Sequence, residues 1–179
     1  IKHAQFRAFC SAKMRMWNSR TEEWKNANKM YPHFLTYDFN AAEGITDGSL
    51  GSPLILIEEA HRLNVPIESL FIEINKKKYK ELRKNLNEFE AAKDFITSKK
   101  LATGNGDNKN YFHNVLEKIK EIEKGEYKNI EGLLFFDNNN LEHLGFCQEF
   151  FNSKITENID ILCFYSAATI KRHKKYTNY

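Results

Sequence analysis

Short apolar segments separated by helical patterns constrain the fold of this 179-residue chain most strongly. Strands are expected at 34–39, 69–74, 101–103, 132–137 and 159–165, with a weaker one at 95–97. Between them, apolar residues spaced three and four apart predict amphipathic helices. Strands that alternate with such helices are typical of an α/β fold with a largely parallel sheet.

The helical segments begin and end at recognisable residues. Ser52 and Pro53 are expected as the N-cap and first turn of a helix that continues to Leu63. Other helices are expected at 6–17, 76–87, 112–122 and 141–151, with a short polar segment starting at Thr21. We expect a single domain that consists of an N-terminal helical segment (1–31), a core (34–166) and a basic tail (167–179).

Composition excludes several classes of protein. Hydrophobic residues make up 41% of the chain and aromatic residues 13%, which excludes global disorder. No apolar run approaches the ~18 residues that a membrane-spanning helix needs, so we expect no membrane segment. The 3 cysteines form no CxxC pair, which favours reduced thiols and a cytoplasmic protein. The 6 histidines lack metal-ligand spacing, so we expect no metal.

The charge balance is mildly basic. The chain carries 27 Lys and Arg against 24 Asp and Glu, a net charge of +3. The dense basic run contains Lys171, Arg172, Lys174 and Lys175. Such a run binds nucleic-acid phosphates in some proteins and only solubilises a tail in others, and both interpretations stay open.

Acidic residues stand where the predicted strands end. Asp38, Glu73 and Asp137 each close a strand, and Asp107 lies in a turn between two elements. Parallel sheets bind ligands at the carboxyl ends of their strands, near the point where the strand order reverses. Four acids at one such edge predict a binding site.

The loop 37–44 follows the first predicted strand and contains small residues, which let backbone approach a ligand closely. It contains neither GxGxxG nor a Walker lysine, so pyrophosphate or triphosphate binding is not expected. The loop could hold a small zwitterion or be an ordinary polar loop. Glu73 could accept both ribose hydroxyls of a nucleoside, or be a solvated strand end. Together, Asp38 and Glu73 favour a nucleoside without phosphate.

The order of these motifs resembles the class I S-adenosylmethionine-dependent methyltransferases. Within that class, the chain is most similar to the three-Cys-motif partner protein group and related phage and bacterial sequences. The resemblance spans about residues 34–166 and is carried by YDFNAAEG (37–44), GSPL (51–54), LFIE (70–73), GD (106–107) and LFFD (134–137). It implies a Rossmann-like methyltransferase fold with helices on both faces of a mostly parallel sheet. Because the sequence ends just after the fifth predicted strand, the final β-hairpin of that fold is expected to be short or missing.

The resemblance also implies S-adenosylmethionine as the cofactor, with a role for each matching position. The methionine part would lie against Asp38, Asn40, Ala41 and Gly44. Glu73 would bind the ribose, and Asp107 with Asn108 would approach the adenine amino group. Asp137 and Asn138 would be the catalytic pair that faces the transferred methyl group.

Two departures from the family pattern bear on function. Ala42-Glu43 replaces a Pro-Gly pair and puts a charge beside the cofactor loop, and Asn138 replaces a proline. The main hypothesis is methylation of nucleic acid, such as a base amino group, by direct displacement. A catalytically inactive binding or assembly module is the alternative, and another nucleoside-using enzyme is a third. A homo-oligomer or a protein partner also stays open.

Overall fold

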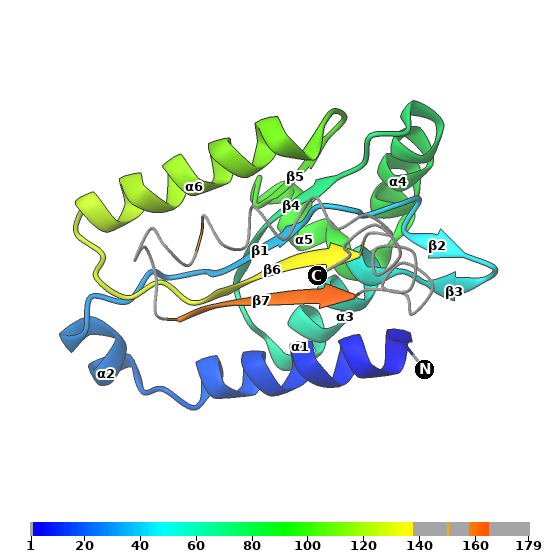
Figure 1. Cartoon of the computed structure of the whole chain (residues 1–179). Helices are drawn as coiled ribbons and strands as arrows, with labels where there is room; N and C mark the ends of the chain where they lie inside the picture. Colours follow the sequence, from blue (N-terminus) through cyan, green and yellow to red (C-terminus); the bar gives the residue numbers. More distant parts are fainter. Residues whose placement is uncertain (1, 138–149, 151–157, 165–179) are drawn as a thin grey trace, which may run out of the picture.

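A sheet of five parallel strands lies at the centre of the protein (Figure 1). The computed structural model describes residues 2–137, 150 and 158–164. The strands are β1 (Phe34–Asp38), β4 (Ile67–Ile72), β5 (Leu101–Gly104), β6 (Gly132–Asp137) and β7 (Ile159–Phe164). Their spatial order is β5-β4-β1-β6-β7, so the direction of winding reverses between β1 and β6. The predicted parallel α/β architecture is therefore confirmed.

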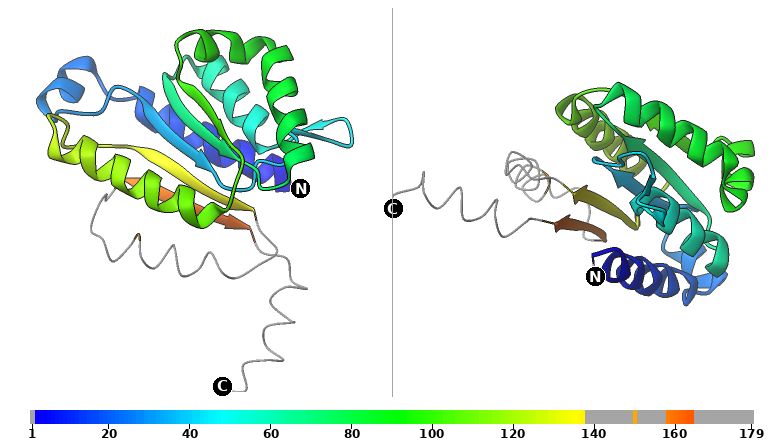
Figure 2. Two further views of the ribbon diagram at one scale, coloured as in Figure 1. Left: turned by 90° about the horizontal axis from the view of Figure 1, so that it is seen from above. Right: turned by 90° about the vertical axis from the view of Figure 1, so that its right-hand side faces the viewer.

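Helices cover both faces of this sheet (Figure 2). They are α1 (Lys2–Asn18), α2 (Glu22–Ala27), α3 (Ser52–Leu63), α4 (Lys76–Glu88), η1 (Glu90–Ala92), α5 (Lys93–Thr97) and α6 (Asn108–Lys124). One face packs against α1, α3 and α4, and the other against α6. A small hairpin of β2 (Ile45–Thr46) and β3 (Ser49–Leu50) projects from the connection between β1 and α3 (Figure 1).

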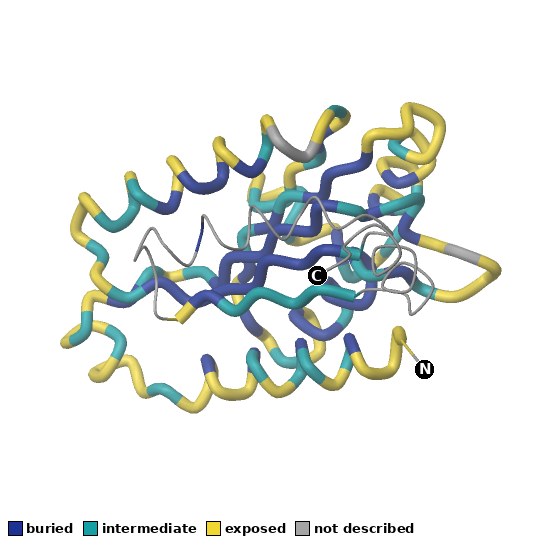
Figure 3. Tube along the Cα trace, in the orientation of Figure 1, coloured by how far each residue is buried: buried dark blue, intermediate teal, exposed yellow. Residues whose placement is uncertain are grey.

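The side chains of the strands alternate between two hydrophobic clusters, as the twofold period of a strand requires. Phe34 and Phe135 pack on the face of α1 and α3. Leu35, Leu134 and Phe136 pack on the face of α6. All five residues of β1 are buried, and the central strands form the most enclosed part of the molecule (Figure 3). A strand that is buried on both faces reads as a continuous apolar run, which explains why 132–137 is recognisable in the sequence.

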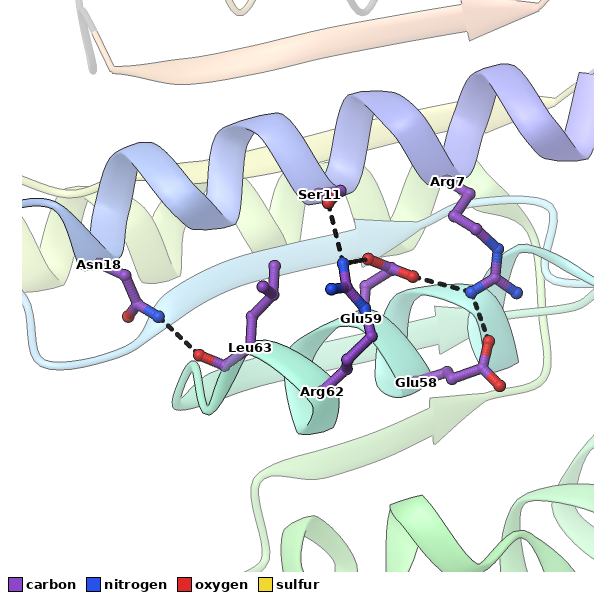
Figure 4. A network of polar contacts seen from close by, with 7 residues as sticks. All are labelled: Arg7, Ser11, Asn18, Glu58, Glu59, Arg62 and Leu63. Atoms are coloured by element: carbon purple, nitrogen blue, oxygen red, sulfur yellow. Dashed lines mark hydrogen bonds and ion pairs between the residues drawn. The ribbon is translucent and has the colours of Figure 1, made fainter.

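The N-terminal helix α1 is an integral layer of the fold. Its Phe6 ring lies 4.4 Å from the Phe135 ring, measured between centroids. Against α3, it forms a polar network around Glu59, which is only 2% exposed (Figure 4). Arg7 donates to Glu59 at 2.8 Å, and Arg62 pairs with the other carboxylate oxygen. Burial alone would raise the pKa of Glu59, but the two guanidinium groups outweigh it and lower the pKa.

Two local predictions were wrong. Residues 95–97 belong to helix α5 and not to a strand, because Phe95 and Ile96 pack from a helical turn against the α3-side cluster. Ser52 is the first helical residue, and Gly51 holds the N-cap position without a side-chain bond. The Ser52 hydroxyl is engaged elsewhere, by Asp38.

Several predictions lie outside the described residues: the helix at 141–151, the basic tail at 167–179 and the state of the final hairpin. Within the described ranges, no helix is long and apolar enough to cross a membrane.

Candidate functional site

The carboxyl edge of the sheet brings the predicted acidic residues to one side of the molecule. Asp38 is the last residue of β1, and Asp137 is the last residue of β6, its neighbour across the reversal. Glu73 directly follows β4, and Asp107 follows β5 by three residues. Because these strands are parallel, their ends meet at one edge, where α/β proteins bind their ligands.

Asp38 is the buried centre of this edge. It is 1% exposed, and its two carboxylate oxygens accept hydrogen bonds from the Asn40 backbone N–H at 3.0 Å and the Ser52 hydroxyl at 2.5 Å. Burial raises the pKa of Asp38 to about 7, and the charges of Asp137 and Glu73 act in the same direction against these two hydrogen bonds. The carboxylate thus connects the end of β1, the loop after it and the first turn of α3.

Ser52→Ala is expected to raise the pKa of Asp38 further. The substitution removes one of the two hydrogen bonds that favour the charged carboxylate, while the buried surroundings stay the same. A pH titration of the Asp38 side-chain carbon by NMR measures this shift. Ser49→Ala, at the exposed start of β3, is the matched control and should leave the titration unchanged. An Asp38 pKa at or below the wild-type value in the Ser52 variant would contradict the assignment.

The loop after β1 stays attached to the neighbouring strand. The Ala41 backbone N–H donates to the Ile72 carbonyl at 2.9 Å, so this loop runs beside the end of β4 and thus beside Glu73. The side-chain oxygen Oδ1 of Asn40 is buried and has no hydrogen-bond partner among the described residues. A buried acceptor without a donor is costly unless a ligand or water supplies one. Asn40 therefore marks a point where a donor group would be favoured.

Gly44 closes the loop. Its φ of +77° lies in the left-handed region that favours glycine, and its carbonyl accepts from the Gly51 N–H at 2.7 Å. A Cβ on Gly51 would stand 3.0 Å from the Gly44 oxygen, so the GSPL motif begins with glycine for steric reasons. The base of the β2–β3 hairpin is thereby fixed against the start of α3.

The Ala42-Glu43 pair turns away from β1 and towards α4. Ala42 has a φ of +51°, an uncommon left-handed conformation for a residue with a side chain. The Glu43 carboxylate pairs with Lys78 at 3.2 Å, and the Glu43 carbonyl accepts from Asn85 at 2.7 Å. The extra charge that the sequence predicts beside this loop is thus balanced by a lysine of α4.

Glu73 lies directly after β4, and one of its two carboxylate oxygens accepts a hydrogen bond. It is 8% exposed, and its Oε1 accepts from the Asn75 N–H at 2.7 Å. No described residue donates to its Oε2. Asn105 donates to the Glu73 carbonyl at 2.7 Å and so joins the loops that follow β4 and β5. The second oxygen of Glu73 is the acceptor that a ligand hydroxyl would need.

The sequence does not predict the positions of three residues near Glu73. The sequence predicts Ile74 as part of the strand, but it lies beyond the end of β4 and is 65% exposed, which is high for a large apolar side chain. Tyr111 packs its ring over the end of β5, where a Cβ on Gly104 would come within 2.5 Å of it. The sequence indicates only a polar turn at Asn105 and gives no sign that this side chain joins the two loops.

Asp107 and Asp137 are more accessible than the other two acids. Asp107 is exposed and precedes α6, whose first residue is Asn108. Asp137 has a side chain that is 32% exposed and pairs with Lys2 at the start of α1. Lys2 also lies 5.5 Å from the centre of the Phe164 ring. No signal in the sequence links Lys2 to this edge. Asn138 and the side chain of Asn108 lie outside what the structure describes.

The described part of the chain contains no group of three or more His, Cys, Asp or Glu residues that could hold a metal ion. The fold and site together define an α/β protein with a Rossmann-like sheet and a cluster of acids at its carboxyl edge. In comparisons with known proteins, the chain matches no family model, no curated protein and no solved structure.

Proposed function

We propose that the protein is a methyltransferase that binds S-adenosylmethionine at the carboxyl edge of its sheet. The observation that carries this proposal is the pair of buried carboxylates at the ends of two adjacent parallel strands, Asp38 and Glu73. Their position beside the reversal in strand order is where nucleoside ligands bind in folds of this type. No Walker lysine or GxGxxG motif is present, which favours a nucleoside without a phosphate chain.

The residues present fit the polar groups of this cofactor. The unused oxygen of Glu73 would accept a ribose hydroxyl, and the unpartnered Oδ1 of Asn40 would accept from an ammonium group. The exposed Ile74 side chain, next to Glu73, offers an apolar surface to the base. Asp38 is too buried for extensive ligand contact and would instead position the loop, including Ala41 and Gly44.

Asp137 would act on the methyl acceptor. When bound, S-adenosylmethionine supplies a methyl group that is activated by a sulfonium. Direct displacement needs mainly alignment and electrostatic stabilisation, which a carboxylate at the end of β6 can provide by accepting hydrogens of an amino group. We propose nucleic acid as the acceptor, with Asn138 as the second polar group and the basic run at 171–175 as the phosphate contact. As part of the same proposal, the protein would act in the cytoplasm.

An inactive binding or assembly module is the second candidate. The ion pair between Lys2 and Asp137 favours it, because this pair occupies the carboxylate that would receive the acceptor. A module of this kind would bind the cofactor or a partner without transferring a methyl group.

Calorimetric titration with S-adenosylmethionine and S-adenosylhomocysteine tests the binding step. Glu73→Gln is expected to weaken binding at least tenfold, because hydrogen bonds to charged groups contribute about 1.5–3 kcal/mol. Glu88→Gln, at the exposed end of α4, is the matched control and should bind as the wild type does. The absence of heat at millimolar concentrations of either ligand would overturn the proposed cofactor.

Transfer of a labelled methyl group to pooled DNA or RNA separates the two candidates. Activity that falls in Asp137→Ala while binding persists would support the enzyme. Binding without transfer to either pool would favour the inactive module.

A further inference from the structure

A cavity lies on the α6 face of the sheet and shares no residue with the acidic edge described above. It has a volume of about 210 Å³ and is bounded by strands β4 and β5 and by α6. Leu70 and Val115 contribute apolar walls, and the ammonium-bearing residues Lys99, Lys100 and Lys118 stand around it. The cavity therefore combines an apolar body with a cationic surrounding.

Tyr37 is a cavity-lining residue whose hydroxyl is buried. The residue is 3% exposed, and its hydroxyl has no hydrogen-bond partner among the described residues. Burial raises the pKa of Tyr37, and the nearby charge of Glu68 adds to this effect, so the hydroxyl keeps its proton. A buried O–H without an acceptor is rare in folded proteins and indicates a missing partner.

Glu68 is not that partner, because the Tyr37 hydroxyl forms no hydrogen bond with it and its carboxylate is bound by other donors. Its Oε2 accepts from the Tyr31 hydroxyl at 2.8 Å and Lys100 at 3.3 Å, and its Oε1 pairs with Lys118. Burial alone would raise the pKa of Glu68, but these three donors lower it to about 2. Glu68 is therefore a charged carboxylate that already has three donors of its own.

The lysines around the cavity outnumber the acids. Lys99, Lys100 and Lys118 line the cavity together with the single carboxylate of Glu68, which leaves an excess of two positive charges. Each ammonium group carries three donors, so those paired with Glu68 can still donate to another acceptor. Lys99 has no acidic partner within the described residues. A negatively charged acceptor would satisfy the Tyr37 hydroxyl and balance this charge at once.

We propose that this cavity binds a small organic carboxylate with a compact apolar body. Size supports this class, since apolar cavities of about 150 Å³ hold benzene, and the cavity here is moderately larger. The apolar walls favour a hydrocarbon body over a bare inorganic anion, and the volume favours a ligand smaller than a nucleotide. The proposal does not depend on the methyltransferase function, because it uses other residues and another face.

Titration with benzoate, followed by amide NMR shifts of the wild-type protein, tests this proposal. We expect saturable shifts in the millimolar range or below, centred on Leu70, Ala102 and Val115. Benzyl alcohol and inorganic phosphate are the comparison probes: one lacks the charge and the other lacks the apolar body. Both are expected to bind at least tenfold more weakly than benzoate. Equal binding of either probe, or the absence of saturable benzoate shifts, would overturn the proposal.

The Tyr37→Phe variant tests whether the Tyr37 hydroxyl contributes to benzoate binding. Because it deletes a buried polar group that has no partner, the variant should fold and melt no lower than the wild type. Its affinity for benzoate is expected to fall about tenfold. Tyr79→Phe, on α4 at the opposite face, removes a hydroxyl that lies 3.4 Å from Thr103 and should leave benzoate binding unchanged. Undiminished benzoate binding in the Tyr37 variant would contradict the assignment.

Discussion

The Asp38→Asn variant is expected to be more stable than the wild type at pH 8 and to bind S-adenosylmethionine at least tenfold more weakly. The pKa of Asp38 is about 7 in the folded protein and 3.8 in the reference state. Between these values, the unfolded chain has lost the proton and the folded chain retains it, so stability falls as the pH rises. This loss of unfolding free energy is complete above pH 7 and amounts to about 4 kcal/mol at most. Asparagine cannot ionise and avoids this loss.

Urea unfolding of both proteins at pH 5 and pH 8 measures the stability difference. The wild type should lose more free energy of unfolding between the two values than the variant does. Asp94→Asn, which changes an exposed acid of α5, is the control and should keep the wild-type pH dependence. A variant that is less stable at pH 8, or that follows the same pH curve as the wild type, would contradict the burial argument.

The binding loss has a separate cause. A negative charge in a buried site attracts an ammonium group even without contact, because the local dielectric screens it poorly. Binding of the cofactor should therefore favour the ionised form of Asp38, and wild-type affinity should increase from pH 6 to pH 8. Calorimetry at these two pH values tests this dependence. Gain of stability with loss of affinity at one position would identify Asp38 as a residue retained for function.

Gly132→Ala is expected to destabilise the fold by about 3 kcal/mol, at the upper end of typical overpacking effects. A Cβ at this position would lie 2.4 Å from the Leu35 carbonyl oxygen and 3.0 Å from the Leu35 Cβ. The obstacle is the backbone of the adjacent buried strand β1, which cannot rotate away as a side chain can.

Thermal unfolding provides the measurement. A loss of this size lowers the melting temperature by roughly 10 °C in a domain of this length. Gly125→Ala is the matched control, since its Cβ would come no closer than 3.3 Å to the Ile122 carbonyl and 3.7 Å to the Glu121 carbonyl near the end of α6. Equal melting temperatures for the Gly132 variant and the wild type would show that β1 and β6 are less closely packed than described.

The sequence is informative where one local pattern decides the structure. The apolar run at 132–137 and the alternation of strands with amphipathic helices predict the parallel sheet, because burial on two faces leaves a distinctive composition. The position of Asp38, Glu73 and Asp137 at one edge follows from strand direction alone. The roles of these residues in binding stay predictions.

The sequence is less informative where a contact between residues far apart in the chain decides the local structure. Ser52 has the composition of an N-cap, but a carboxylate 14 positions earlier engages its hydroxyl. The apolar residues at 95–97 fit a strand or a helical turn, and packing beneath α3 selects the helix. Lys2 meets Asp137 across 135 positions, a relationship that no local pattern contains.

The contacts of α1 with the last strands have a consequence for folding during synthesis. Phe6 packs on Phe135, and Lys13 pairs with Asp160 on β7. Contacts between such distant residues form slowly, because a long stretch of chain must be closed before they can form. Helix α1 is made long before β6 and β7 exist, so the part of it that packs on these strands remains uncovered until they are made. In a nascent chain, the surface of α1 that later contacts β6 and β7 is thus exposed to aggregation until those strands are made.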